Sequence, residues 1–477
     1  MDSRISARAL SALLGAWRSR EPAYEALADG VRLLCLDSRV APGTALPAER
    51  ELASALAVSR TTVAAAYRSL RDTGHIESLR GSGSVTLPLA RDSTWPAAVG
   101  GVESIDLQQA SPPAWPGLAG VVSEVAGSAS RIISRSGYDV VGREGLRKAI
   151  ADRYSRRGLP TSVEQILVTT GAQSAIHLLA SVLVRRGDRV VIETPTYPHA
   201  AEALRRAGGR LVSVPVTTDD GWDLDRATQV FSRTLPTLAY LMPDFQNPTG
   251  RTMAPDERAV ILDAATRAGT VVVVDETTAD LDIDRAATPV PFGADRSART
   301  KVLRVGSLGK TVWGGLRVGW IRADVEVVRR LAVARSAHDL GTPELEQAIA
   351  ELLVERLDDI LPQRSHLLRT GRDAVAAALR ARLPSWRVPD VDGGMSLWVD
   401  LPAPLSAPLV MDARSSGLLL SAGPRFGVDG GHERRLRIPF TAPARDLERA
   451  AAILEASWER VRTGAPIALL ETYDALV

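Results

Sequence analysis

One lysine stands in a setting that suits covalent chemistry with an aldehyde. The chain has 477 residues and 58 lysines plus arginines, yet its lysines are only Lys148, Lys301 and Lys310. Lys310 follows an apolar run and the segment Gly306-Ser307-Leu308-Gly309. A lysine in a dry pocket has a lowered pKa, and its neutral amine can form a Schiff base. Chemistry that needs a lysine amine is therefore assigned to Lys310.

A second group of residues suits a phosphate. Gly171-Ala172-Gln173 follows an apolar run and opens a predicted helix through Leu178 and Leu179. Free amides at a helix N-terminus, beside a glycine, make an anion site. Ser307 and Arg317 can add a hydroxyl and a guanidinium to it. A turn before any buried helix has the same pattern, so this motif alone decides nothing.

Three more residues suit a flat, charged ring. Tyr197 can stack on a ring, although an aromatic residue after a strand is more often simple packing. Asn247 can donate to a phenolic oxygen, although Asn-Pro is also a turn signal. Asp275 ends the run 271–274 of four valines, and a buried carboxylate there needs a cation. That cation is either a protonated pyridine nitrogen or an internal arginine.

The elements that must position these residues alternate along the chain. From about residue 106, helical stretches alternate with apolar runs at 166–168, 190–192 and 271–274. This pattern predicts an α/β fold with a mostly parallel sheet and helices on both faces. Ligands in such sheets bind at the carboxyl ends of the strands, where the residues above would meet.

The N-terminal part has a different pattern. A helix is expected over Glu49 to Leu56, then a turn, then a helix capped by Ser59 that stops at Gly74. In a helix-turn-helix, the first turn of the second helix meets base edges in the major groove. Here that turn carries Arg60, Thr61 and Thr62. Two short strands over 75–88, around Arg80-Gly81-Ser82-Gly83, would form a wing; the alternative is a plain helical hairpin with a small sheet.

The totals fit an ordinary globular protein. Hydrophobic residues make up 45% and charged residues 24%, and the net charge is +2, so the basic surface of a DNA-binding protein must be local. Cys35 is the single cysteine, which excludes an internal disulfide and fits a reducing cytoplasm. Residues 1–4 lack an apolar signal core and no apolar run is long enough to span a membrane. We therefore expect a cytoplasmic protein, with no membrane partner and no metal site.

The N-terminal motifs closely resemble the GntR-family winged helix-turn-helix over residues 22–88. They run from Pro42-Gly43 through 46–53 and 58–63 to Gly74 and Gly81-Ser82-Gly83. The resemblance implies double-stranded DNA as a partner. It also implies which residues contact DNA, because they match the DNA-contacting positions of that family: Arg50, Arg60, Thr61, Thr62, Arg80 and Gly81.

The motifs of residues 106–465 resemble fold-type-I pyridoxal-phosphate enzymes of the class I/II aminotransferase group. The resemblance implies pyridoxal 5'-phosphate as cofactor and Lys310 as its aldimine lysine. It assigns the phosphate to Gly171, Ala172, Gln173, Ser307 and Arg317, the ring face to Tyr197, the ring oxygen to Asn247, and the ring nitrogen to Asp275.

The resemblance also implies an effector or substrate site, and it has one departure. The resemblance implies that Arg437 binds the substrate carboxylate, or Arg435 if the register of the motif differs. It also implies that Tyr138 lies in a segment near the pocket. The family commonly has a tyrosine two or three residues after the ring aspartate. Thr277 and Thr278 stand there instead, with Thr278 kept as a cofactor-contact candidate, which puts efficient transamination in doubt.

A GntR-type head fused to an aminotransferase-like body resembles the MocR subfamily of bacterial regulators, which are typically homodimers. We divide the chain into an extension (1–21), the winged head (22–88), a linker (89–105), the body (106–465) and a tail (466–477). The expected function is a regulator that senses pyridoxal phosphate itself or an amine or amino-acid effector. The alternatives are a working aminotransferase with a DNA-binding appendage, and a body that only dimerises two heads.

Overall fold

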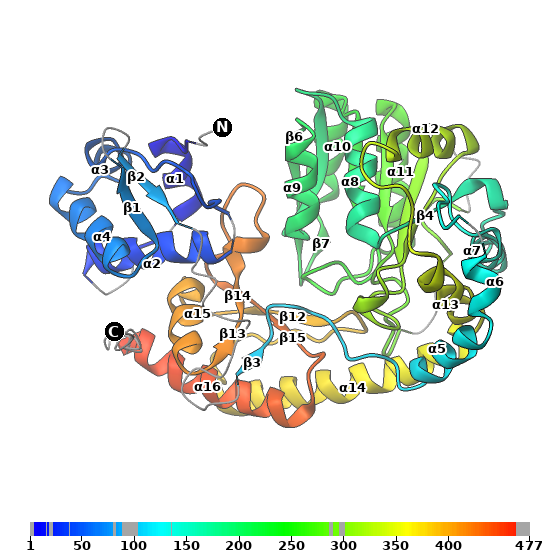
Figure 1. Cartoon of the computed structure of the whole chain (residues 1–477). Helices are drawn as coiled ribbons and strands as arrows, with labels where there is room; N and C mark the ends of the chain where they lie inside the picture. Colours follow the sequence, from blue (N-terminus) through cyan, green and yellow to red (C-terminus); the bar gives the residue numbers. More distant parts are fainter. Residues whose placement is uncertain are drawn as a thin grey trace.

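The structure is a computed structural model of the whole chain (Figure 1). It describes residues 4–15, 17–18, 22–37, 39–79, 83–87, 104–134, 136–285, 290–294 and 301–463. Most of the expected linker, the wing tip with Arg80 and Gly81, and the expected tail therefore lie outside the described residues. Among the described residues, no helix combines the length and the apolar character needed to cross a bilayer.

The head is a small helical unit with a two-stranded wing. Its elements are α1 (Ala7–Leu14), α2 (Ala23–Leu36), α3 (Glu49–Leu56), α4 (Arg60–Asp72), β1 (Ile76–Leu79) and β2 (Gly83–Thr86), the two strands being antiparallel. Leu10 of α1 is fully buried in one core with Leu27, Leu52 and Val63. The first residues, expected only as an extension, therefore contribute a helix to the core of the head.

The body is built on an eight-stranded sheet in the order β4-β11-β10-β9-β8-β5-β6-β7. Five strands pair in parallel in the order β6-β5-β8-β9-β10, whereas β11 and β7 run antiparallel to their neighbours. This confirms the expected mostly parallel sheet. The strands are β4 (Ile166–Thr169), β5 (Arg189–Thr194), β6 (Arg210–Thr217), β7 (Gly221–Trp222), β8 (Leu238–Leu241), β9 (Val271–Asp275), β10 (Val302–Ser307) and β11 (Gly319–Arg322).

Alternate side chains of these strands enter two different cores, as the pleat of a strand requires. Val190 and Val273 pack on one face against α8 (Ala172–Leu183), α9 (Pro198–Arg206) and α12 (Val325–Arg335). Val191 and Val272 pack on the other face against α10 (Leu224–Thr234) and α11 (Pro255–Ala268). A third core joins the β4 and β11 end to α5 (Leu118–Gly127), α6 (Ala129–Ile133), α7 (Glu144–Arg156) and α13 (Glu344–Glu355). The sheet and these helices form the large lobe.

The small lobe has a three-stranded sheet, β12-β15-β14, and a two-stranded pair, β13-β3. The strands are β3 (Ile105–Asp106), β12 (Ser396–Asp400), β13 (Leu418–Leu419), β14 (Ser421–Ala422) and β15 (Arg435–Pro439). The helices are α14 (Leu357–Arg382), α15 (Ser406–Ser415) and α16 (Ala444–Thr463), and short 3₁₀ turns lie at η2 (Val163–Gln165), η3 (Gly314–Leu316) and η4 (Gly423–Phe426). α14 runs along the bottom of both lobes (Figure 1).

The head packs directly on the small lobe. α2 of the head contacts α15 (Figure 1), and Leu33 of α2 is buried in the core of the small lobe. The last turn of α2 brings Asp37 to the same boundary, where its carboxylate is buried. The head is thus in physical contact with one wall of the body.

Candidate functional site

A cavity of about 550 Å³ lies where the carboxyl ends of the large-lobe strands meet the small lobe. The site residues expected from the sequence come from eight separate segments of the chain. The structure brings most of them to this one cavity: Ala172, Gln173, Tyr197, Asn247, Asp275, Thr278, Ser307, Lys310, Arg317 and Arg437 all line it.

Lys310 follows β10 and points into this cavity. Its Nζ donates a hydrogen bond to the carbonyl oxygen of Ala110 at 2.6 Å. Burial lowers the pKa of the Lys310 amine to about 8, helped by the nearby guanidiniums of Arg437 and Arg317, while Asp275 acts in the opposite direction. A lysine with such a pKa has a substantial neutral fraction near pH 7, which nucleophilic attack on an aldehyde requires.

Asp275 closes the bottom of the cavity at the end of β9. Its carboxylate accepts hydrogen bonds from the Thr277 amide at 2.9 Å, the Thr277 hydroxyl at 2.6 Å and the hydroxyl of Tyr240. Burial raises the pKa of Asp275 above its ordinary value. Among the ion pairs of the described residues none involves Asp275, so the alternative of an internal arginine partner does not hold there. The carboxylate remains suited to a cationic ring nitrogen.

The phosphate candidates gather around the N-terminus of α8. Gly171 precedes the helix with φ +85°, and a Cβ at this position would stand 2.7 Å from Nη2 of Arg317. Arg317 donates to the carbonyl oxygen of Thr170 at 3.1 Å and thereby stays beside the helix terminus. The absence of a side chain at Gly171 keeps a cradle of amides and one guanidinium open to an anion.

Neither of the two threonines near Asp275 replaces the family's tyrosine. The Thr277 hydroxyl donates to Asp275, and the Thr278 hydroxyl donates to the carbonyl oxygen of Asp244 at 2.9 Å. Both hydroxyl protons are therefore already engaged with protein acceptors. Asn247 and Tyr197, which were expected to contact a ring oxygen and a ring face, both line the cavity.

Arg437 of β15 is fully buried at the small-lobe side of the cavity. Its Nη2 donates to the carbonyl oxygen of Gln108, its guanidinium lies over the ring of Phe426 at 4.7 Å, and its Nε has no hydrogen-bond partner among the described residues. Burial lowers the pKa of Arg437 to about 10. Arg435 does not line the cavity and pairs with Asp400 at 3.9 Å. The geometry thus favours Arg437 over Arg435 for an anionic ligand.

Tyr138 is an expected site residue that does not line the cavity of its own chain, and Gly171 is not among the lining residues either. The Tyr138 side chain is 73% exposed, and Ile133 nearby is 70% exposed. In a single chain this tyrosine therefore cannot contact a ligand that Lys310 holds.

Sequence reasoning missed four contributors to the site. Gln108 and Ala110, which receive the hydrogen bonds of Arg437 and Lys310, lie in a short segment without any motif. Tyr240 carries the one polar side-chain group of β8, the strand next to β9. A hydroxyl in an apolar strand needs a hydrogen-bond partner, and this signal could have indicated Asp275. Arg425 of η4 lines the cavity and pairs with Glu202 at 2.8 Å.

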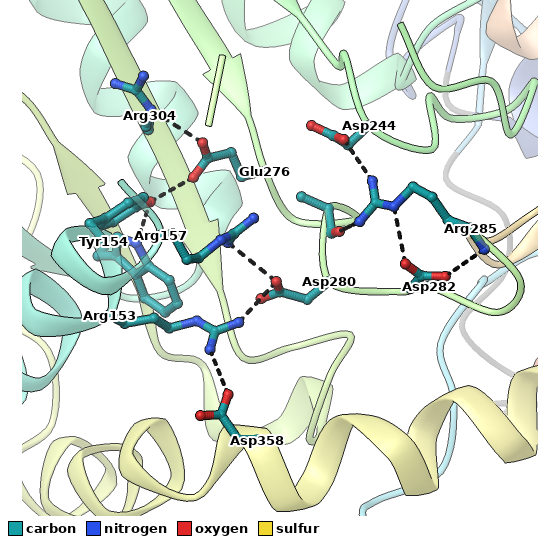
Figure 2. A network of polar contacts seen from close by, with 12 residues as sticks. Arg153, Tyr154, Arg157, Asp244, Glu276, Asp280, Asp282, Arg285, Arg304 and Asp358 are labelled. Carbon is teal, nitrogen blue, oxygen red and sulfur yellow. Dashed lines mark hydrogen bonds and ion pairs between the residues drawn. The ribbon is translucent and has the colours of Figure 1, made fainter. Parts of the chain in front are cut away.

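A buried polar network lies directly behind the Asp275 loop (Figure 2). The Glu276 carboxylate accepts a hydrogen bond from the Tyr154 hydroxyl at 2.7 Å and pairs with Arg304 of β10 at 3.2 Å. Burial raises the pKa of Glu276, and the cations around it act in the opposite direction. These contacts fix the residue after Asp275 to α7 and β10, so they help to position Asp275.

The same network reaches the long helix of the small lobe. Arg153 of α7 pairs with Asp280 at 3.0 Å and with Asp358, in the first turn of α14, at 3.5 Å (Figure 2). Asp280 also pairs with Arg157 at 3.3 Å. The loop that follows Asp275 is therefore tied to α7, which itself pairs with the first turn of α14.

In the head, the DNA-contact candidates lie together on α3 and the first turn of α4. The Ser59 hydroxyl accepts from the Thr62 amide at 3.0 Å, which confirms the expected N-cap. Arg60 is 74% exposed and pairs with Glu49 at 3.2 Å, and Arg50 and Thr61 are exposed as well. A surface pair of this kind is worth about 0–1 kcal/mol, so phosphate or base contacts can replace it.

Two family models match different parts of the chain. The model described as bacterial regulatory proteins, gntR family, matches residues 23–85. The model described as aminotransferase class I and II matches residues 131–454. These matches fall on the head and on the body.

Relatives of both kinds are found. The 2-aminoadipate transaminase of Thermus thermophilus is 33% identical over 333 residues, which cover 68% of this chain and 82% of the relative. The structure of α-aminoadipate aminotransferase LysN from T. thermophilus has a TM-score of 0.69 at 29% identity and covers 76% of this chain and 93% of that one. The probable rhizopine catabolism regulatory protein MocR of Rhizobium meliloti is 30% identical over 408 residues, or 79% of this chain and 81% of the relative.

The chain belongs to the class I and II aminotransferase family and is a MocR-type GntR regulator. This MocR-type regulator is a DNA-binding protein whose body takes pyridoxal phosphate as its cofactor. The residues present fit that cofactor. The glycine cradle at Gly171 would suit the phosphate, and the buried carboxylate of Asp275 would suit the ring nitrogen. The Nε of Arg437, which has no partner among the described residues, would be free for a ligand carboxylate.

Proposed function

We propose that this MocR-type regulator senses an amine or amino acid through pyridoxal phosphate held as an aldimine on Lys310. Arg437 binds the effector carboxylate, and the cofactor contacts are those assigned from the resemblance. If the effector is pyridoxal phosphate itself, the same site responds to its binding alone. The regulator works as a cytoplasmic homodimer on double-stranded operator DNA.

One observation carries the sensing proposal. The two side chains that would hold the ligand, Lys310 and Arg437, both hold backbone carbonyls of one segment, those of Ala110 and Gln108. This segment directly follows the strand β3, the first element of the body after the head–body linker. Bonding of Nζ to an aldehyde carbon removes donor protons from Lys310, and a carboxylate competes for the guanidinium of Arg437. Ligand binding therefore changes how this segment is held.

A second path leads from the cavity to the head through η4. Arg425 and Phe426 line the cavity, and Pro424 lines the groove between the head and the small lobe. The charge of Arg425 acts on Asp37 at the end of α2. A shift of η4 on binding of a carboxylate to Arg437 would therefore change the electrostatic environment of Asp37 at the end of α2. Effector binding needs such differential contacts to change DNA affinity.

The dimer proposal is supported by exposed apolar side chains. Ile133, Tyr138, Leu340 and Leu345 are between 42% and 73% exposed, and Gly341 lies against the backbone of Asp139. Apolar groups gathered on a surface indicate a contact with another molecule. The role of Tyr138 in effector binding is proposed only for the dimer, because it does not reach the cavity of its own chain.

A working aminotransferase is the second candidate, since a transaminase is 33% identical to the body. The hydroxyls of Thr277 and Thr278 are engaged with Asp275 and Asp244, which counts against efficient turnover.

The test is a spectroscopic titration of the purified protein with pyridoxal phosphate and then with amines. A visible absorbance band that amines change without formation of a keto acid supports the sensor, steady keto-acid production supports the enzyme, and no band with any amount of cofactor rules out both.

A further inference from the structure

An arginine-rich edge lies at the end of the large-lobe sheet that is remote from the cofactor cavity. It is formed by three short segments, 185–189, 205–210 and 233–237, which we call the arginine edge. Seven arginines and a single acidic residue, Asp188, lie in these segments. All seven arginines are exposed: Arg185, Arg186, Arg189, Arg205, Arg206, Arg210 and Arg233. The whole chain has a net charge of +2, so this local excess of positive charge is large.

Backbone contacts hold the three segments together. The Gly187 amide donates to the carbonyl oxygen of Gly208 at 2.8 Å, and the Thr237 amide donates to that of Arg189 at 3.0 Å. Arg189 and Arg210 begin the parallel strands β5 and β6 and are direct register partners. Like charges directly opposite each other destabilise a sheet, so folding alone gives no reason for this pair.

The arginine side chains have few partners. Arg189 donates to the carbonyl oxygen of Thr234 at 3.2 Å. Arg205 donates to that of Val428 and also interacts electrostatically with the carboxylates of Asp429 and Glu202. The other five have no side-chain hydrogen bond or ion pair among the described residues, and the carboxylate of Asp188 accepts only the backbone amide of Arg185. Arg205, Arg206 and Arg233 lie in the last turns of α9 and α10, where a positive charge favours the helix. That effect does not account for Arg185, Arg186, Arg189 and Arg210.

We propose that the arginine edge binds the phosphate backbone of double-stranded DNA that flanks the site bound by the head. This inference rests on the proposed DNA-binding function. Exposed guanidiniums without acidic partners bind phosphates without reading sequence, and they gain affinity by releasing counterions. The head lies on the side of the large lobe that carries β6 and α9, with α3 and α4 on the side of the head turned away from that lobe (Figure 1). DNA that bends around the head toward the large lobe would therefore meet the arginine edge. The body then adds length and salt dependence to DNA binding, while the head supplies the specificity.

The test compares two duplexes that contain the same binding site from the region upstream of the protein's own coding sequence. The short duplex contains only the central part of the stretch that the protein protects from nuclease digestion. The long duplex contains the same central part and adds flanks of unrelated sequence. The affinity of the full-length protein is measured over a range of salt concentrations. The variant is the triple substitution R186A/R206A/R210A. The control is R380A/R382A/R387A, which removes the same number of exposed arginines from the small lobe, each of them paired with a carboxylate.

The wild-type protein is expected to bind the long duplex more tightly than the short one. The triple variant should bind the long duplex roughly tenfold more weakly at low salt and lower the slope of log affinity against log salt by up to about 3, since each phosphate contact contributes about 0.9. Its affinity for the short duplex and the behaviour of the control should equal those of the wild type.

Three outcomes would overturn the inference. The wild type could bind both duplexes equally, the triple variant could weaken both to the same extent, or it could change only self-association, which would make the edge a protein-binding surface. If the wild-type protein bound neither duplex, the proposed function itself would be refuted. The variant R60A separates the two ideas, because it should weaken binding to both duplexes.

Discussion

Lys310 donates a hydrogen bond from its amine to the carbonyl oxygen of Ala110 at 2.6 Å. The lysine assigned to the cofactor is thereby connected to the chain that enters the body from the head. Arg437, the arginine assigned to the effector carboxylate, makes the equivalent contact with Gln108. A ligand that engages both side chains replaces both contacts, which gives the regulator a physical route from ligand to head.

Replacement of Lys310 by alanine should abolish the visible absorbance band obtained with pyridoxal phosphate, because no other lysine in the described part of the chain lines the cavity. The fold should remain, since the side chain makes one hydrogen bond. Lys301→Ala is the matched control, as Lys301 is exposed and outside the cavity. A band that survives in Lys310→Ala, or one lost in Lys301→Ala, would contradict the assignment of Lys310.

Arg437→Ala should weaken the binding of a carboxylate-containing amine by about 2–5 kcal/mol, which is roughly 30-fold or more. The loss is large because the guanidinium is buried and its Nε has no partner within the described part of the chain. Binding is measured from the spectral change on amine titration, and the band with the cofactor alone should persist. Arg435→Ala, two residues away on the same strand, should leave the affinity for the amine unchanged. An equal loss of affinity in both variants would show that the strand itself was disturbed.

Asp37 gives a prediction on pH. Burial raises the pKa of its carboxyl to about 6, although Arg425, Arg39 and Arg414 act in the opposite direction. A carboxyl with a raised pKa in the folded state stabilises that state while protonated, and the stabilisation is lost as pH rises to about 6. Asp37→Asn removes the cost of the buried charge, so it should raise the free energy of unfolding by about 1–3 kcal/mol near pH 8 and change little near pH 4.

Thermal or denaturant unfolding at both pH values checks the Asp37 prediction. A gain of equal size at both pH values would mean that the ionised carboxylate is not the cause.

Arg60→Ala should weaken operator binding by about 1–3 kcal/mol, the usual cost of losing one good base contact. The residue is 74% exposed at the first turn of α4, so the fold should be unaffected. The absorbance band should also be unchanged, because Arg60 lies in the head. Unchanged DNA affinity in this variant would show that α4 is not placed as a recognition helix.

Local patterns predicted the elements whose signals are contained in short stretches of sequence. The bounds of α3 agree with the expected helix over Glu49 to Leu56, and Ser59 caps α4 as its type suggested. The valine run formed the buried strand that ends at Asp275. Such features depend on capping and periodicity, which neighbouring residues determine.

What the sequence could not predict depends on tertiary contacts. α1 packs into the head because apolar residues far along the chain cover it, and the segment with Gln108 and Ala110 enters the site only through the small lobe. The partnership of Tyr240 and Asp275 requires the parallel pairing of β8 with β9. The choice between Arg437 and Arg435 also needed the fold, since both belong to one motif and one of them reaches the cavity.

The most direct test of the central claim is the affinity for operator DNA with the cofactor present, before and after addition of an amine that changes the absorbance band. The account predicts that this affinity changes by about 5-fold to 150-fold in the wild type, the range of typical allosteric coupling, and not at all in Lys310→Ala. If pyridoxal phosphate itself is the effector, the change appears on adding the cofactor and is again absent in Lys310→Ala. An operator affinity that is the same in every ligand state of the wild type would contradict the claim that the body senses a ligand for the head.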